Sequence, residues 1–205
     1  MKNENELSIP RAVRSQQVKK QIYDAAISLL HDYGYEYITV ANICKLAHVS
    51  TGSFYHYFDS KDTLMANFFI EGYEQFKQAQ TAPLDDPIDD IVSFYCSYSD
   101  YCQAQGLDFI RHFYTPFNKC MDMRRSMTPS GHYALPSMFE TAEKIRAAVD
   151  KGILQPDIDA NQIADDLCTI EKGCIFEWCI CDGSFTIRDL TQRLLRNYLK
   201  AYLKN

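Results

Sequence analysis

Apolar side chains recur along most of the chain at steps of three and four residues, which is the spacing of one face of an α-helix. The first such run predicts a helix that ends near Gly34, because glycine readily adopts the left-handed conformation that closes a helix. The run consists of Val18, Ile22, Ala25, Ala26, Leu29 and Tyr33. Thr39, Ser50 and Ser60 precede the next runs, and their hydroxyls suit the N-cap position. The N-terminal part of the chain is thus predicted to hold four helices joined by short turns.

The rest of the chain shows the same period after a polar break, QTAPLDDP, at residues 80–87. Pro87 suits the first position of a helix, and Asp86 suits its N-cap. The predicted helices cover about 87–106, 107–114, 136–150, 160–181 and 186–203, and the second is expected to continue, kinked, past Pro116 towards Met127. The sequence shows neither strand-like alternation nor internal repeats. It predicts an all-α fold with an N-terminal module over 1–60, a connecting helix over 61–79 and a helical bundle over 80–205.

Composition and charge narrow the class of protein. Of 205 residues, 46% are hydrophobic and 23% charged, as in ordinary soluble domains. The densest apolar run, 174–181, is short and contains Glu177, so no membrane span is expected. The N-terminal residues lack the apolar segment of a secretory signal, so the eight cysteines are expected to be reduced thiols in the cytoplasm.

The net charge of −6 is unevenly distributed. Residues 1–70 have seven basic and seven acidic side chains, whereas residues 71–205 have fourteen and twenty, which accounts for the whole −6. An acidic body attached to a neutral N-terminal segment still allows that segment to meet phosphate groups. The overall charge therefore does not exclude a nucleic-acid partner.

Residues 38–64, ITVANICKLAHVSTGSFYHYFDSKDTL, combine two short capped helices with a tight turn at residues 47–49. This pattern predicts a helix-turn-helix, whose second helix can enter the major groove of DNA. Val49 and Phe54 are expected to pack against the first helix of the motif. Gly52 lets the backbone approach a phosphate closely, and Lys61 adds a cation at the start of the next helix.

The string VSTGSFYHYFDSKDTL resembles the N-terminal module of the TetR family of bacterial transcriptional regulators, and the similarity extends over about residues 15–75. Beyond that region the similarity is architectural and includes the pattern around Gly173, Trp178 and Gly183. The resemblance implies a three-helix DNA-binding module followed by a helical bundle for ligand binding and dimerisation. It implies DNA contacts by Thr39, Thr51, Gly52, Ser53, Tyr55, His56, Tyr57 and Lys61.

This chain departs from the family pattern at Thr51, where many members have Lys or Arg. Base preference is therefore expected to depend on small polar groups, the His56 ring and DNA shape, or on an N-terminal arm with Arg11 and Arg14. Without the resemblance, the same segment is also explained as a structural helical unit in which the tyrosines are half-buried.

Residues 87–182 are rich in aromatic and sulfur side chains, which suit the lining of an apolar ligand pocket. The candidate lining residues are Tyr98, Tyr101, Phe109, His112, Phe113, Phe117, Met121, Phe139 and Trp178. Core packing is the better explanation for any single one of these aromatic side chains, so the pocket as a whole is implied mainly by the family resemblance. The expected effector is a small apolar or aromatic molecule.

The last predicted helix has an apolar stripe wider than one buried face requires, and it is expected to join the preceding helix in a homodimer interface. The candidate interface residues are Ile187, Leu190, Leu194, Tyr198 and Tyr202. The alternative is a monomer in which this stripe covers the chain's own core.

Other classes of function have weaker support. The chain has no nucleophile elbow, Gly-rich phosphate loop or HExxH string, so neither an enzyme nor a metal or other cofactor is expected. A thiol-based redox or soft-metal sensor on the same scaffold is an alternative suggested by Cys168, Cys174, Cys179 and Cys181, although no CxxC pair is present. A protein-docking module is a second alternative.

The sequence therefore predicts a cytoplasmic, homodimeric regulator that binds a palindromic operator in double-stranded DNA. It is expected to be a repressor that a small ligand releases, because ligand binding would favour a different spacing of the two recognition helices. The operator sequence and the identity of the effector do not follow from the sequence.

Overall fold

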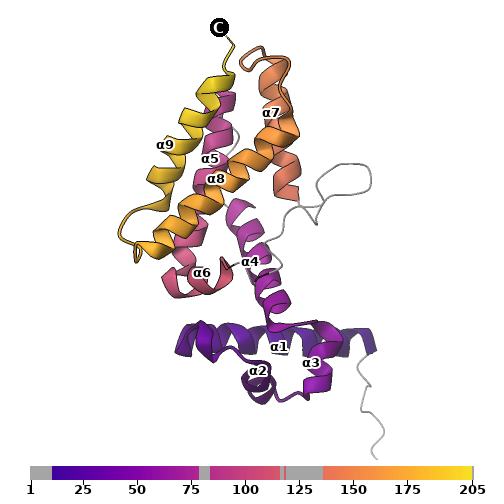
Figure 1. Cartoon of the computed structure of the whole chain (residues 1–205). Helices are drawn as coiled ribbons and strands as arrows, with labels where there is room; N and C mark the ends of the chain where they lie inside the picture. The colour runs from indigo at the N-terminus through magenta and orange to yellow at the C-terminus, as the bar shows by residue number, and fades with distance from the viewer. Residues whose placement is uncertain (1–10, 79–83, 116–117, 119–135, 205) are drawn as a thin grey trace, which may run out of the picture. The chain divides into compact units, whose positions relative to one another are not determined.

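The structure is a computed structural model that describes residues 11–78, 84–115, 118 and 136–204. In this part of the chain the regular structure is helical, apart from one isolated antiparallel bridge between Leu154 and Leu203 (Figure 1). The all-α prediction is thereby confirmed. Phe117, Met121 and the expected kinked continuation past Pro116 lie outside the described residues.

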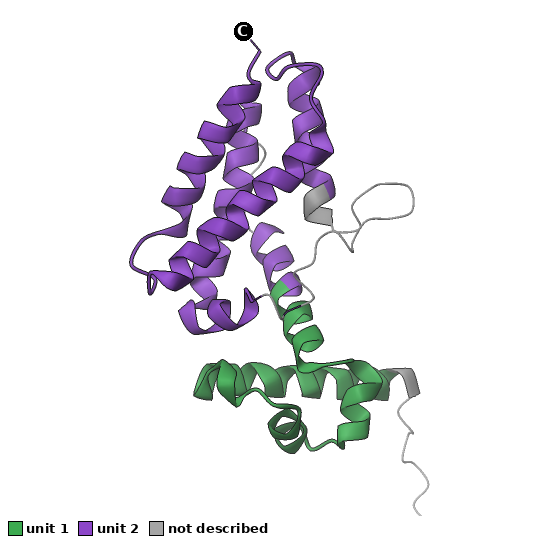
Figure 2. Ribbon diagram, viewed as in Figure 1, with its two compact units in different colours: residues 1–69 green, residues 70–205 purple. Residues whose placement is uncertain are grey.

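The chain forms two compact units, residues 1–69 and 70–205 (Figure 2). The boundary between them lies within helix α4 (Lys61–Gln78). None of the described helices is long and apolar enough to cross a membrane.

The first unit contains α1 (Arg11–Tyr33), a 3₁₀ turn η1 (Tyr35–Tyr37), α2 (Val40–Ala47), α3 (Thr51–Tyr57) and the first half of α4. Helix α1 packs against α2, and α2 packs against α3. The side chains at the centre of this unit are at most 1% exposed; they are Ile22, Ala26, Ile38, Ile43, Phe54, Leu64 and Met65. The helical period of the sequence therefore identified most of the buried face of α1, but Tyr33, which ends the predicted run, is 61% exposed.

The helix ends of the first unit also follow the sequence. The hydroxyls of Thr39 and Ser50 accept hydrogen bonds from the Asn42 and Ser53 amides at 3.1 and 3.0 Å. The Ser60 hydroxyl accepts one from the amide of Thr63 at 3.0 Å. These three caps satisfy amides that have no partner within their own helix.

The second unit contains α5 (Pro87–Gln105), α6 (Leu107–Phe113), α7 (Pro136–Asp150), α8 (Ala160–Ile180), α9 (Ile187–Leu199) and a final 3₁₀ turn η4 (Lys200–Tyr202). Helix α5 packs along α9, and α7 packs along α8. Their shared core includes Ile91, Ile145, Leu154, Leu167, Leu195 and Leu199. Asp86 caps α5 by accepting from the amides of Ile88 and Asp89 at 2.8 and 2.9 Å, with Pro87 in the first turn, as predicted.

Candidate functional site

Helix α3 has a buried side and an exposed side. The rings of Phe54 and Phe58, at its middle and its C-cap, are 0% and 2% exposed and hold the helix in the first unit. The exposed positions of this helix are Thr51, Gly52, Tyr55 and His56, whereas Ser53 and Tyr57 are half-buried. The structure thus presents a short helix whose outer face has hydroxyl, phenol and imidazole groups within one and a half turns.

The fold of the chain itself does not require a glycine at position 52. A β-carbon placed there would meet a single neighbouring atom within 4 Å, the Ser50 hydroxyl oxygen at 3.8 Å, and the backbone is helical. Alanine would fit this space and favours helix more strongly than glycine. A requirement for glycine would therefore have to arise from a partner that approaches the backbone of α3 from outside.

Thr39 lies at the exposed start of helix α2. Its hydroxyl oxygen accepts the Asn42 amide, so the hydroxyl proton is still able to donate to an incoming acceptor. The Asn42 side-chain amide donates to the carbonyl oxygen of Tyr37 at 2.9 Å, which ties the start of α2 to the preceding turn. This helix N-terminus thus offers a positioned hydroxyl to an anion such as phosphate.

Lys61 opens helix α4 and is half-buried. Its ammonium nitrogen lies 4.9 Å from the centre of the Tyr35 ring, a cation–π distance. The Tyr35 hydroxyl donates to Asp62 Oδ1 at 3.4 Å. The ring thus restrains the lysine at the start of the helix.

Sequence reasoning did not single out Lys45, which is exposed in the last turn of α2. The buried residues of that helix are Ile43, Cys44 and Ala47, so position 45 lies off the buried face. The helical period around Ile43 and Ala47 already indicates that Lys45 lies on the exposed side of α2, and this signal could have added it to the candidate DNA contacts.

The candidate pocket residues lie in different environments. Tyr101, Phe109, Phe113 and Trp178 are buried, and Tyr98 and His112 are half-buried. Phe139 is 44% exposed, which places it largely at the surface.

Some of these side chains come together in the structure. The Tyr73 ring lies 4.9 Å from that of Tyr98 and 5.6 Å from that of Tyr101, and the hydroxyls of Tyr98 and Tyr114 share a hydrogen bond. Phe109 and Phe113 stack on each other, with 5.4 Å between ring centres.

The described cysteines do not resemble a thiol sensor. Burial raises the pKa of the Cys96 thiol to about 11, and burial also raises the pKa values of Cys168, Cys174 and Cys179. Sensor thiols need the opposite shift, because the thiolate is the reactive form. Within the described residues no group of three or more His, Cys, Asp or Glu side chains could hold a metal ion. The redox or metal alternative is therefore not favoured.

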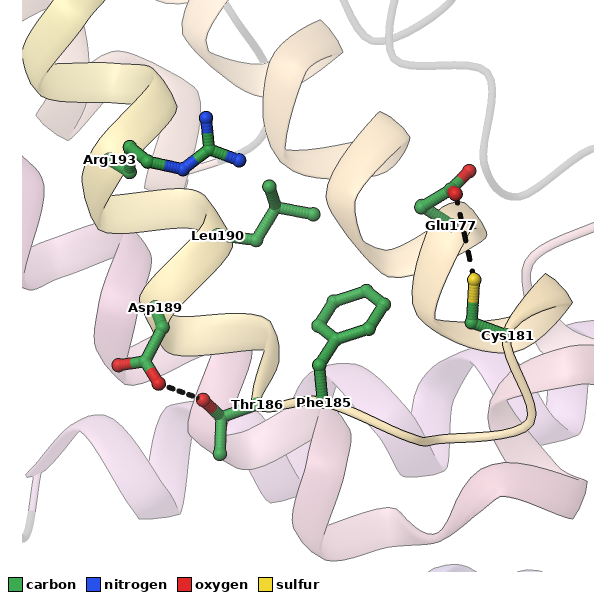
Figure 3. A pocket seen from close by; sticks show the side chains of 7 residues that line it. All are labelled: Glu177, Cys181, Phe185, Thr186, Asp189, Leu190 and Arg193. Atoms are coloured by element: carbon green, nitrogen blue, oxygen red, sulfur yellow. Dashed lines mark hydrogen bonds between the residues drawn. The ribbon is translucent and has the colours of Figure 1, made fainter.

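A surface hollow of about 710 Å³ lies between α8 and α9 (Figure 3). Its lining consists of Glu177, Cys181, Phe185, Thr186, Asp189, Leu190 and Arg193. The Cys181 thiol donates to Glu177 at 3.5 Å, and the Thr186 hydroxyl donates to Asp189. Both signs of charge thus border an apolar centre formed by Phe185 and Leu190.

The candidate interface residues divide into two groups. Ile187 is 0% exposed and points into the core of its own unit. Leu190, Leu194, Tyr198 and Tyr202 are half-buried.

Two exposed side chains on α8 extend the apolar surface beyond these candidates. Phe176 and Ile180 are 52% and 58% exposed, and sequence reasoning did not include them. They lie off the helix face that buries Ile175, Trp178 and Cys179.

Three comparisons relate this geometry to known proteins. The family model "Bacterial regulatory proteins, tetR family" matches residues 22–67, which include the helix-turn-helix. The HTH-type transcriptional regulator HbdR of Aromatoleum sp. (strain CIB) is 28% identical over 141 residues, or 67% of this chain. The aligned region spans 60% of the length of HbdR.

Solved structures share the fold over most of the chain. FadR of Thermus thermophilus, a TetR family transcriptional repressor in complex with lauroyl-CoA, aligns with a TM-score of 0.66 at 20% identity over 87% of this chain and 91% of its own. SmeT, the repressor of the multidrug efflux pump SmeDEF of Stenotrophomonas maltophilia, aligns with a TM-score of 0.61 at 18% identity over 93% of each chain. The region of the helix-turn-helix thus matches the tetR family model, and the chain shares the fold of these TetR family structures.

Proposed function

We propose that the protein is a DNA-binding transcriptional regulator that binds a palindromic operator as a homodimer and is released from it by a small ligand. The observation that carries this proposal is the exposed face of α3, where Gly52 lies among Thr51, Tyr55 and His56 with no packing partner that explains it. A capped helix with this face suits entry into a major groove.

In this proposal the phosphate contacts come from the helix ends around α3. The hydroxyl of Thr39 and the ammonium group of Lys61 lie at the starts of α2 and α4, where helix dipoles also favour an anion. The base contacts come from Thr51, Ser53 and His56, and Tyr55 and Tyr57 flank them. Because phosphate contacts position a protein while base contacts specify the sequence, replacing residues of the two groups should have different effects.

The homodimer would form through α8 and α9. The exposed rims of these helices combine the apolar side chains of Phe176, Ile180 and Leu190 with Glu177 and Arg193, which carry opposite charges. A surface that contains both members of a charge pair suits a two-fold contact, in which the same patch is used by both subunits. The two recognition helices would then reach successive turns of DNA.

The effector would bind within the second unit. The T. thermophilus FadR structure contains lauroyl-CoA, which supports a small-molecule effector for a bundle of the same fold. Release from DNA requires a ligand that binds the two conformations of the dimer with different affinity. A cytoplasmic location follows from this role.

The test is selection from a random duplex DNA library at a fixed salt concentration, followed by sequencing of the retained DNA. We expect a palindromic motif, and we expect binding to weaken as salt increases because phosphate contacts release counterions. Retention without a motif, or no retention, would contradict the proposal. Tyr55→Ala should abolish selection of the motif, whereas Tyr33→Ala, at an exposed tyrosine outside the helix-turn-helix, should leave it unchanged.

A further inference from the structure

The second unit contains a carboxylate in its interior. Glu171 lies on α8 and is 2% exposed, in the part of the bundle where α5, α8 and α9 meet. Its Oε1 accepts a hydrogen bond from the Ser99 hydroxyl of α5 at 2.6 Å. Ser99 Oγ also lies 3.0 Å from the hydroxyl oxygen of Thr191 on α9. One residue from each of the three helices thus forms a buried polar cluster.

The protein groups around Glu171 do not satisfy its carboxylate. Within the described part of the chain, Oε2 of Glu171 has no hydrogen-bond partner although it is buried. Three acceptor oxygens surround the Ser99 hydroxyl: Oε1 of Glu171, the Thr191 hydroxyl oxygen and, at 3.2 Å, the Tyr95 carbonyl oxygen. The single hydroxyl proton of Ser99 can be donated to one of them at a time. An ionised carboxylate can accept about four hydrogen bonds, so the cluster leaves most of this capacity unused.

Protonation of Glu171 does not provide its Oε2 with a hydrogen-bond partner. A protonated Oε2 would be a donor that needs an acceptor, and the described residues provide none at this atom. Leaving a buried polar group unsatisfied costs free energy in either state. The charge that acts on the carboxyl is that of Asp100, which has the same sign, and Asp100 is itself paired with Arg188 at 2.9 Å. The cluster is therefore suited to a partner that brings its own hydrogen-bond donor.

The surroundings of the cluster are aromatic. Tyr98 and Tyr114 share a hydrogen bond; burial raises the pKa values of both hydroxyls, and the charge of Glu171 raises them further. The Tyr73 ring packs edge-on against Tyr98 at 4.9 Å. Aromatic walls with a few convergent polar groups are typical of sites for small organic ligands.

We propose that Glu171 is the polar anchor of an effector site, and that this site takes an aromatic ligand that presents an ammonium or hydroxyl donor to Oε2. The inference rests on the proposed role of the second unit as the effector domain. It specifies the ligand's chemistry, which neither the fold nor the comparisons assign. The anchor joins α5, α8 and α9, so a ligand held there would act on both helices of the proposed dimer surface, α8 and α9.

The test compares three probes of similar size: benzylamine, which is an ammonium ion at pH 8, benzyl alcohol, and benzyl methyl ether, which has no donor. Binding is measured by calorimetry and by the shift in melting temperature of the full-length protein. We expect the two donor probes to bind at least about tenfold more tightly than the ether, since the ether leaves the carboxylate unpaired. Equal affinities for all three probes, or no binding of any, would overturn the inference.

Glu171→Gln is nearly isosteric, and it should reduce the affinity for benzylamine at least about tenfold by removing the negative charge. Glu71→Gln is the matched control, because Glu71 is exposed on α4 and lies outside the α8–α9 surface, and it should retain the preference for donor probes. A preference that persisted in Glu171→Gln would contradict the proposal. Far-UV circular dichroism without a probe establishes that both variants fold.

The pH dependence of probe binding to the unaltered protein tests the role of Glu171 without a variant. Between pH 8 and pH 5 the affinity for benzylamine should fall relative to that for benzyl alcohol, because burial raises the pKa of Glu171 to about 7 and the acid is neutral at pH 5. The surrounding tyrosines and thiols have raised pKa values and stay neutral at both pH values; they are Tyr95, Tyr98, Tyr114, Cys96, Cys102 and Cys174. If the ratio of the affinities for benzylamine and benzyl alcohol were the same at both pH values, Glu171 would not be the anchor.

The library selection separates this inference from the proposed function. A protein that selects a palindromic motif but shows no donor preference would refute the anchor alone. A protein that binds donor probes through Glu171 but retains no DNA would refute the proposed function alone.

Discussion

The hydroxyl of Ser99 lies 2.6 Å from Oε1 of Glu171, in a region of the bundle where both side chains are buried. This hydrogen bond and the neighbouring Thr191 hydroxyl favour the ionised carboxylate, but burial opposes it more strongly and raises the pKa of Glu171 to about 7. The folded protein therefore holds a proton on this group at pH values where the unfolded chain has released it.

The first prediction concerns the pH dependence of stability. Because the folded-state pKa is above the usual glutamate value of 4.5, the stabilising contribution of Glu171 is fully present below pH 4.5 and is lost as pH rises through about 7. Relative to the unaltered protein, Glu171→Gln should gain unfolding free energy between pH 5 and pH 8, by up to about 3 kcal/mol. Urea unfolding at the two pH values measures this difference.

The control for that experiment is Glu71→Gln, which removes an exposed carboxylate on α4, outside the α8–α9 surface. Its unfolding free energy should follow that of the unaltered protein at both pH values. If Glu171→Gln showed the same pH dependence as the unaltered protein, the burial argument would be incorrect.

The second prediction separates stability from DNA binding at position 52. Gly52→Ala should raise the unfolding free energy of the first unit by up to about 1 kcal/mol, because alanine is the better helix former and its methyl group fits the space. The same methyl group should obstruct close approach to DNA, and affinity for the selected duplex should fall at least about tenfold. Fluorescence anisotropy and thermal unfolding of one preparation give both values. Unchanged DNA affinity would remove the main support for α3 as the recognition helix.

Much of the fold was predictable because it follows from local rules. The caps at Thr39, Ser50 and Asp86 and the apolar period around Ile22 and Ile91 depend on side chains within a few positions of each other. The helix-turn-helix was predicted for the same reason, and the match of the family model to residues 22–67 agrees with it.

The interior of the second unit was harder to predict, because it depends on contacts between distant segments. Glu171 follows Leu167 by four residues and precedes Cys174 by three, so the helical period places it on the buried face of α8. A charged residue on that face was the available signal. Its partner Ser99 lies 72 positions away, and no local pattern connects the two. The apolar stripe of α9 likewise did not distinguish Ile187, which is in the core, from Leu190, which borders the surface hollow.

The third prediction concerns the turn of the helix-turn-helix. His48 ends α2 in the left-handed conformation, with φ at 54° and its backbone amide bonded to the Cys44 carbonyl oxygen. A β-branched side chain is strained in this conformation, so His48→Val should destabilise the first unit by about 1–2 kcal/mol. His48→Gly removes the strain but increases the freedom of the unfolded chain, so its effect should be within about 1 kcal/mol.

Two optical signals separate the units in that experiment. Trp178 is the single tryptophan of the chain and reports on the second unit, whereas far-UV circular dichroism reports on both. The valine variant should shift the circular dichroism transition and leave the Trp178 fluorescence transition in place. Equal stability of the valine and glycine variants would show that the turn is not strained as described.

The fourth prediction tests the proposed dimer surface. Ile180 is 58% exposed at the end of α8, where a second copy of the chain would cover it. Ile180→Asp would bury an unpaired charge in that contact, a change that typically costs several kcal/mol. The variant should be a monomer at micromolar concentration by light scattering, with a far-UV spectrum like that of the unaltered protein and much weaker binding to the palindromic duplex.

Leu84→Asp is the matched control, since Leu84 is an aliphatic side chain of similar exposure, 47%, that lies before α5 and outside the α8–α9 surface. It introduces the same charge and should leave the dimer intact. A dimer that survived Ile180→Asp would place the subunit contact elsewhere. A monomeric unaltered protein would require each recognition helix to bind its half-site independently, because without a two-fold contact the spacing of the half-sites is not enforced.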